Sequence, residues 1–280
     1  MTKRYRLPGR IFDAHNHLAA ADRDGSKHIA LMDAAGVETA VVMGVPFGTA
    51  RVIREANEAV VRANAKYPGR LVGGVYLDPR KGTKAIDAMK AARAEDIRLV
   101  KLFPNLGYYP DDARFRKFFD TIAKLGMGVL SHCGWLWPQP GCDFASYYSH
   151  PGRFEKVIRM HPETPFILAH MGGIAGFLET VMLTTRTPNT YVDCSPGQGL
   201  NVLEFAPRIA GSIPVGKLLW GRDGAAYDKA TFERYRKALV GAGFGPHLRE
   251  VFYINARDLF TKLGALKPPK KTARRKRTRK

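Results

Sequence analysis

Short apolar runs recur at fairly even intervals along the whole chain. They are rich in Val, Ile, Leu and aromatic residues and begin near residues 11, 38, 70, 97, 127, 165, 189 and 217. Between them lie segments such as 50–66 and 112–125, where apolar residues are spaced three and four apart as in amphipathic helices. Buried strands that alternate with helices predict parallel β-α-β units.

Eight such units fit one closed (β/α)8 TIM barrel, which needs roughly 250 residues, and this chain has 280. An open doubly wound sheet is the alternative, and it would favour a glycine-rich phosphate turn after the first strand. No GxGxxG motif occurs, and the first run ends in histidines instead. We therefore predict an α/β barrel as a single domain over residues 1–266, closed by a helix near residues 247–263.

The chain is strongly basic, with 45 Lys and Arg against 25 Asp and Glu and a formal net charge of +20. Nine of these cations lie in residues 267–280, which contain no acid and no apolar periodicity. We expect this tail to be disordered because it can bury nothing. It could bind nucleic acid or an acidic membrane surface through its charge, or it could simply add solubility.

The rest of the composition is that of an ordinary globular protein, since 45% of residues are hydrophobic and 25% are charged. The three cysteines show no CxxC spacing, and we expect Cys133 to be a small buried side chain rather than a nucleophile. No stretch approaches the roughly 18 apolar residues of a membrane span, and the basic N-terminus lacks the apolar region of a signal peptide. We expect a cytoplasmic protein, with a homodimer as one alternative for its oligomeric state.

Polar residues close several of the apolar runs. The first run ends in the sequence DAHNH, and its His15 and His17 should project to one side because a strand has a period of two. The fifth run ends in His132, the sixth in His170 and the eighth in Asp223. A barrel gathers the carboxyl ends of its strands around one axis, so these side chains should converge.

Four histidines and a carboxylate offer the nitrogen and oxygen ligands that suit a zinc-like ion with a position left open for water. Each run is apolar until its last residue, and a polar group buried there is costly unless it has a partner. The structural alternative is that these are five unrelated polar residues, each of which simply ends a strand. The pattern favours a metal site.

The motifs FDAHNHL, VKLFPN, GVLSHCG, FILAHMGG, LLWGRD and YINARDLF span residues 11–260. Together they resemble the amidohydrolase superfamily of metal-dependent TIM barrels, and specifically its amidohydrolase-related branch. Similar proteins include hydrolases, decarboxylases and hydratases. The resemblance therefore implies the fold and a metal-dependent reaction, and it leaves the reaction type open.

The resemblance also implies roles for single residues. His15, His17, His132 and Asp223 would bind one divalent metal, with zinc as the first choice and manganese or another divalent ion as alternatives. His170 would orient or polarise the attacking water. Asp223 could accept the proton of that water while it touches the ion.

Three further residues lie close to these motifs. Asp13 is expected to orient a metal ligand through a hydrogen bond. Arg222 stands where the family often has Ser or Thr, and by strand alternation we expect it to point away from the metal and form a structural pair rather than anchor substrate. Lys101 lies in the strand whose carboxylated lysine bridges two metals in binuclear relatives; a substrate-facing cation and a structural salt bridge are the alternatives.

Substrate selection should fall to the loops that follow the strands. Arg80 or Lys101 could clamp a carboxylate. Trp135 or Trp137 could wall the pocket, although a tryptophan near a loop often only packs. No loop is long enough for a cap domain, so we expect a small substrate that carries a carboxylate.

We therefore predict a metal-dependent hydrolase that uses activated water on a small ester, lactone or amide, with His170 and Asp223 as catalytic residues. The alternative within the family is a metal-dependent decarboxylase of a small aromatic or unsaturated acid. The alternative from another class is a non-catalytic barrel associated with nucleic acid, and the complete set of metal-ligand residues argues against it.

Overall fold

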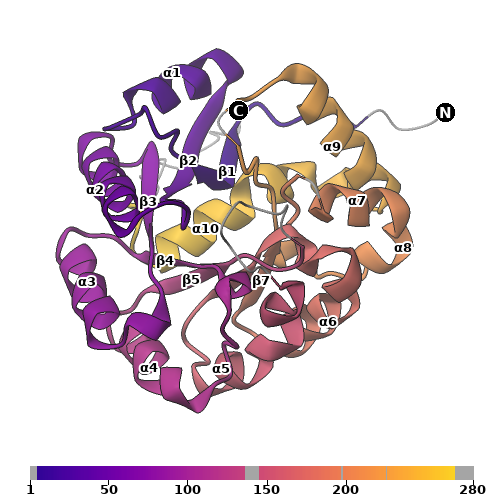
Figure 1. Cartoon of the computed structure of the whole chain (residues 1–280). Coiled ribbons are helices and arrows are strands. Elements are labelled where there is room, and N and C mark those ends of the chain that lie inside the picture. Colours follow the sequence, from indigo (N-terminus) through magenta and orange to yellow (C-terminus); the bar gives the residue numbers. More distant parts are fainter. Residues whose placement is uncertain (1–4, 136–144, 197, 225, 269–280) are drawn as a thin grey trace, which may run out of the picture.

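The computed structural model describes residues 5–135, 145–196, 198–224 and 226–268. Eight parallel strands form one sheet in chain order, and helices surround the barrel that they form (Figure 1). The strands are β1 Ile11–His17, β2 Val37–Met43, β3 Leu71–Tyr76, β4 Leu99–Leu102, β5 Gly128–Ser131, β6 Phe166–Leu168, β7 Thr190–Asp193 and β8 Leu218–Leu219. Each begins within two residues of the predicted apolar run, which confirms the TIM barrel.

The helices are α1 Ser26–Ala35, α2 Ala50–Lys66, α3 Thr83–Ala94, α4 Arg116–Lys124, α5 Glu155–Met160, α6 Gly173–Arg186, α7 Gln198–Phe205, α8 Pro207–Ala210, α9 Lys229–Gly241 and α10 Asn255–Lys262. Short 3-10 turns are Pro79–Lys81, Pro104–Leu106, Ala113–Phe115, Ser146–Ser149, Pro151–Phe154, Ala169–Gly172, Val215–Lys217 and Gly245–His247. The expected limits of α2 are confirmed, and its start is fixed because the Thr49 side chain accepts a hydrogen bond from the Val52 N–H.

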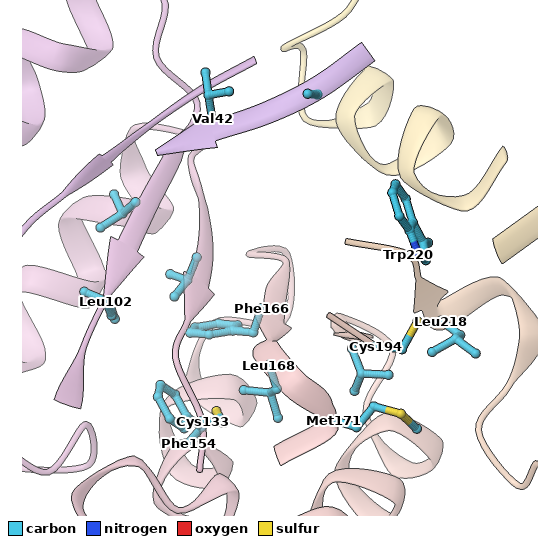
Figure 2. Packing of buried hydrophobic residues seen from close by; sticks show 14 of the residues in the cluster. Val42, Leu102, Cys133, Phe154, Phe166, Leu168, Met171, Cys194, Leu218 and Trp220 are labelled. Atoms are coloured by element: carbon cyan, nitrogen blue, oxygen red, sulfur yellow. The ribbon is translucent and has the colours of Figure 1, made fainter. Parts of the chain in front are cut away.

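An outer apolar layer joins the strands to the helices. Figure 2 shows Phe154, Phe166 and Trp220 packed in this layer. Cys133 and Cys194 lie in the same layer as fully buried free thiols. The structure thus agrees with the expectation that Cys133 packs as a small buried side chain.

An inner apolar layer fills the barrel itself, as inward side chains do in this fold. Its strand residues include Phe12, Val41, Val72, Leu99, Leu130, Ile167 and Leu219. At the amino-terminal end of β1, the ring of Phe260 from α10 stacks on Phe12 with the centroids 5.6 Å apart. Both rings are fully buried, so α10 closes the floor of the barrel.

The last strand, β8, meets the first strand, β1, over a short length. β8 has only two residues, so it is shorter than the apolar run KLLWGRD suggested. Beyond it, the Asp223 N–H donates a hydrogen bond of 2.7 Å to the carbonyl oxygen of His15. Gly221 permits this approach, because a Cβ there would lie 2.7 Å from the Cβ of His15.

The predicted C-terminal helix consists of three consecutive parts. The 3-10 turn Gly245–His247 and a π-helical segment, Glu250–Ile254, precede α10. Gly264 follows with φ 77°, a left-handed conformation that ends the helix. The tail lies outside the described residues from position 269 onward. Among the helices that are described, none has the length and apolar character needed to cross a membrane.

Candidate metal centre

Five polar side chains meet at the carboxyl end of the barrel. His15 and His17 belong to β1, His132 follows β5, and His170 and Asp223 come after β6 and β8. The Asp223 carboxylate has Oδ1 at 3.4 Å from Nε2 of His15 and at 3.3 Å from Nε2 of His17. Its Oδ2 is 3.7 Å from Nε2 of His170, and that nitrogen is 3.1 Å from Nδ1 of His132. The structure brings together all five residues that the sequence assigned to one site.

Two of these residues have a left-handed backbone. His170 has φ 57° and ψ 28°, and Asp223 has φ 46°. Such conformations cost roughly 1–3 kcal/mol for a residue with a side chain, and they persist where the surrounding structure holds them, often at active sites. Asp223 is therefore not in extended chain, so the strand alternation assumed for Arg222 does not hold there. Arg222 nevertheless lies in a structural pair, with Nη2 at 4.0 Å from Oδ2 of Asp228.

Asp193, the last residue of β7, is a site residue that the sequence analysis missed. Its Oδ2 lies 2.9 Å from Nδ1 of His15, and its Oδ1 accepts a 3.1 Å hydrogen bond from the His170 N–H. The hydroxyl of Ser195 also donates to Oδ1 and lies 2.8 Å from Nδ1 of His170. The seventh apolar run ends in a polar residue as the others do, and that pattern is the signal that could have identified Asp193.

The electrostatic state of these buried groups follows from their neighbours. Burial and the adjacent Lys101 lower the pKa of His15 to about 4, so its imidazole is neutral at pH 7. Burial opposes ionisation of Asp193, but His15 and the hydrogen bond from Ser195 hold its pKa below the usual value. Burial likewise opposes ionisation of Asp223, yet the imidazoles against its carboxylate keep its pKa well below the ordinary range. Two carboxylates and neutral imidazoles therefore line the site.

Asp13 acts on the backbone rather than on a ligand ring. Its carboxylate accepts hydrogen bonds from the N–H of His15 at 3.1 Å and from the N–H of Arg222 at 2.9 Å. The Tyr227 hydroxyl and the Asn16 side chain donate to it as well, at 2.8 Å and 2.7 Å. Asp13 thus hydrogen-bonds a candidate ligand, as expected, but through the His15 backbone, which fixes where β1 and the chain after β8 lie, whereas Asp193 contacts the His15 ring.

The site residues fit a divalent metal ion. Within the described part of the chain, Nδ1 of His17 and Nε2 of His132 are buried nitrogens without a hydrogen-bond partner. Buried polar atoms are rarely left without a partner, so each such atom calls for an explanation. Nε2 of His15, Nε2 of His17 and the Asp223 carboxylate lie close enough together to share an ion, and they are the nitrogen and oxygen donors that zinc and similar ions prefer.

Lys101 lies in the floor of the site, fully buried, with its amine 3.0 Å from Nε2 of His15. Burial lowers the pKa of Lys101 to about 8. It forms no ion pair with any residue that the structure describes, so the alternative of a structural salt bridge receives no support. The amine also lies 4.7 Å from the ring centroid of Phe103, which stacks on His132 at 5.3 Å. Lys101 therefore faces the candidate ligands beside an aromatic flank.

The other predicted substrate contacts are less central. Arg80 pairs with Asp78, Nη2 to Oδ2 at 2.8 Å, and its guanidinium lies 5.6 Å from the ring centroid of Tyr108. Trp135 is 65% exposed, and its backbone forms hydrogen bonds with the Gln198 side chain. Trp137 lies outside the described residues. Of the three candidates that the structure describes, Lys101 alone contacts the five-residue cluster.

A groove of about 910 Å³ lies elsewhere, between α2 and α3 on the outside of the barrel. Its lining includes Ile53, Val61, Ala85 and Ala88 and none of the clustered histidines. Its lining contains no histidine or cysteine. The chemistry therefore belongs to the mouth of the barrel.

Comparison with known proteins agrees with this geometry. Residues 10–268 match the protein family described as Amidohydrolase. The chain belongs to the amidohydrolase family. It is thus an enzyme of the amidohydrolase superfamily, whose members act as hydrolases or decarboxylases and are typically metal-dependent. A search of curated proteins gives no match.

Solved structures with low sequence identity share the fold of this amidohydrolase. An uncharacterised TIM-barrel protein from Bordetella bronchiseptica is 17% identical, with a TM-score of 0.65 over 91% of this chain and 99% of that one. A probable 2-pyrone-4,6-dicarboxylic acid hydrolase from Acinetobacter baumannii, with citric acid bound, is 18% identical, with a TM-score of 0.62 over 90% and 99%. The 2,6-dihydroxybenzoate decarboxylase from Rhizobium is 19% identical, with a TM-score of 0.61 over 90% and 98%.

Proposed function

We propose that this amidohydrolase is a metal-dependent hydrolase of a small ester, lactone or amide that carries a carboxylate. The position of Asp223 carries the proposal, because one of its oxygens faces His15 and His17 and the other faces His170. A carboxylate between candidate metal ligands and a candidate acid–base residue can take up the proton of a water held at that point.

His15, His17, His132 and Asp223 would hold the ion, which we propose to be zinc because three of the four ligands are imidazoles. A divalent ion bound there supplies a Lewis acid that lowers the pKa of a water ligand toward about 7. The residues of the chain must then position the substrate and move the proton.

Oδ2 of Asp223 and Nε2 of His170 are 3.7 Å apart, so both atoms can reach one water oxygen. As that oxygen attacks the carbonyl carbon, Asp223 accepts its proton, and the His170 ring, whose Nε2 lies 3.1 Å from Nδ1 of His132, orients the water by confining its position. The bond from the carbonyl carbon to the leaving oxygen or nitrogen then breaks. The proton on Asp223 passes to the leaving atom, which returns the carboxylate to its starting state.

Lys101 supports a substrate with a carboxylate. Its amine is buried at the site, and within the described chain no acid is paired with it. A buried ammonium group that no carboxylate contacts directly can bind an anionic ligand strongly, because the low dielectric enhances the interaction. The hydrolase among the structural neighbours is named for a dicarboxylic acid, which is consistent with this substrate class.

The second candidate is a metal-dependent decarboxylase of a small aromatic or unsaturated acid. The aromatic flank favours it: Phe103 lies against Phe47 at 5.7 Å and Tyr76 at 6.1 Å and stacks on His132. A planar substrate could pack on such a flank while Lys101 pairs with its carboxylate.

Turnover in ¹⁸O-labelled water separates the two candidates. We would supply the purified protein with Zn²⁺ or Mn²⁺ and screen carboxylate-bearing esters, lactones, amides and aromatic acids. Hydrolysis places one ¹⁸O in the organic product, whereas release of CO₂ without label in that product identifies the decarboxylase. Asp223→Asn should lower kcat about 10²–10⁴-fold, and Asp228→Asn is the matched control because Asp228 caps α9. Inactivity toward every substrate class with both metals would contradict both candidates.

A further inference from the structure

We propose that Asp193 and Ser195 are positioning residues that set the tautomers of three histidines, so that His15 and His132 each present an unprotonated Nε2 to a divalent ion. The inference rests on the proposed metal site and is independent of the reaction performed there. It follows from counting the protons available in one chain of buried hydrogen bonds.

The first step concerns His15. An ionised carboxylate can only accept hydrogen bonds, so the 2.9 Å contact between Oδ2 of Asp193 and Nδ1 of His15 requires the proton to be on Nδ1. A neutral imidazole carries one proton, so Nε2 of His15 has none. The Lys101 amine, which can only donate when protonated, lies 3.0 Å from that Nε2 and agrees with this assignment.

The second step passes through Ser195. Its hydroxyl has one proton and donates it to Oδ1 of Asp193. The 2.8 Å contact between the same hydroxyl oxygen and Nδ1 of His170 therefore needs a proton from His170. His170 is thus protonated at Nδ1, and its Nε2 is an acceptor.

The third step reaches His132. Its Nδ1 lies 3.1 Å from Nε2 of His170, and two imidazole nitrogens at this distance need one proton between them. Because Nε2 of His170 has none, the proton is on Nδ1 of His132, and Nε2 of His132 is bare. Independently, that Nε2 is the buried nitrogen for which the described residues offer no hydrogen-bond partner. A bound metal ion would supply the missing partner for this nitrogen.

A purely structural role for Asp193 predicts something different. Its Oδ1 also accepts hydrogen bonds from the backbone N–H groups of His170 and Ser195, at 3.1 Å and 3.0 Å. If Asp193 only held these turns, removing the Ser195 hydroxyl would leave every imidazole tautomer unchanged. The imidazole tautomers in a Ser195 variant therefore distinguish the positioning role of Asp193 from a purely structural one.

The test is long-range ¹H–¹⁵N NMR of the full chain labelled at histidine nitrogens, with Zn²⁺ affinity measured by competition with a chelator. In the metal-free protein we expect Nδ1–H tautomers for His15, His170 and His132. Ser195→Ala should release His170 and His132 from this state, leave His15 in it, and weaken Zn²⁺ binding about tenfold. Asp193→Asn should alter all three rings and weaken Zn²⁺ binding about 10–100-fold.

Ser131→Ala is the matched control, because Ser131 is equally buried beside the site and its hydroxyl donates only to a backbone carbonyl. It should leave the tautomers and the Zn²⁺ affinity unchanged. A wild-type His170 protonated at Nε2, or unchanged signals and affinity in Ser195→Ala, would overturn the proposal. If Asp193→Asn fails to fold, Ser195→Ala still decides. The test uses no substrate. A protein that shows these tautomers and binds Zn²⁺ but hydrolyses nothing would therefore refute the proposed function and leave the tautomer proposal standing.

Discussion

The backbone N–H of Asp223 donates a 2.7 Å hydrogen bond to the carbonyl oxygen of His15. The candidate general base is therefore tied to the strand that carries two candidate ligands, although the two residues come from opposite ends of the barrel sequence. The same bond holds Asp223 at φ 46°. Asn tolerates the left-handed conformation better than most residues, so Asp223→Asn can remove the charge while the tie remains.

Substitution of a proposed metal ligand and substitution of the proposed general base should have different effects on metal content. His15→Ala or His17→Ala should release the metal and abolish activity, because a site with few protein ligands cannot lose one. Asp223→Asn should retain part of the metal while kcat falls about 10²–10⁴-fold, because an amide oxygen can coordinate weakly and cannot accept the proton. Metal stoichiometry measured beside kcat tests this, and complete metal loss in Asp223→Asn would show that Asp223 acts chiefly as a ligand.

His170→Asn should spare most of the metal and reduce kcat more than metal occupancy. The reason is that His170 is assigned to the water, and Asn can keep its left-handed backbone at φ 57°. The measurement is again metal content against turnover. Should this variant lose its metal as fully as His15→Ala does, His170 would be a ligand.

Lys101→Met should raise KM for a carboxylate-bearing substrate by at least about tenfold with a smaller change in kcat, because the buried cation is removed and the packing volume is largely kept. Zn²⁺ affinity should not fall, since Lys101 now donates to the Nε2 of His15 that a metal would use. Lys84→Met on the exposed side of α3 serves as the control. If Lys101→Met instead loses one of two bound ions, the bridging lysine of binuclear relatives becomes the better description.

His28 should make stability depend on pH. It is buried between Asp22, which accepts its backbone N–H, and the Tyr227 hydroxyl, which lies 3.3 Å from Nε2 and donates to Asp13. Burial lowers the pKa of His28 from 6.5 to about 4. The unfolded chain therefore takes up a proton first as pH falls, and stability is lost between about pH 6.5 and 4, by roughly 3 kcal/mol at most from this group.

His28→Gln should flatten that part of the profile. The free energy of unfolding, measured with denaturant from pH 7 to pH 4, should fall less in the variant than in the wild type. Above pH 7 the two curves should run parallel, because neither side chain titrates there. Parallel curves over the whole range would show that His28 is not the responsible group.

Deletion of residues 267–280 should leave the unfolding temperature and the turnover of a neutral substrate nearly unchanged. The segment carries nine cations and lacks apolar residues that could pack on the barrel. Any affinity for nucleic acid should fall, with a shallower dependence on salt. A large drop in unfolding temperature would mean that the tail docks on the barrel.

The barrel could be predicted from the sequence because its strands are buried on both faces. Each strand then appears as an apolar run of its own, and the eight runs located β1 to β8 within two residues. The same logic located the five clustered side chains, since a polar residue at the end of a buried strand is conspicuous. The local pattern thus predicted where the strands lie and which residues end them.

Contacts between distant segments could not be predicted in this way. The pairing of Asp193 with His15 depends on how β7 and β1 flank β8 where the barrel closes, which no local period describes. The left-handed turns at His170 and Asp223 are likewise held by such contacts, so a regular strand was expected where β8 stops after two residues. The exposure of Trp135 depends on a loop conformation that sequence spacing does not fix.

The stacked rings of Phe12 and Phe260 close the amino-terminal end of the barrel. Because buried aromatic and aliphatic side chains fill that end of the barrel, a substrate would reach the clustered histidines from the carboxyl end. Substrate, water and product would all pass through this end of the barrel. Product that stays bound there would therefore block the next substrate molecule.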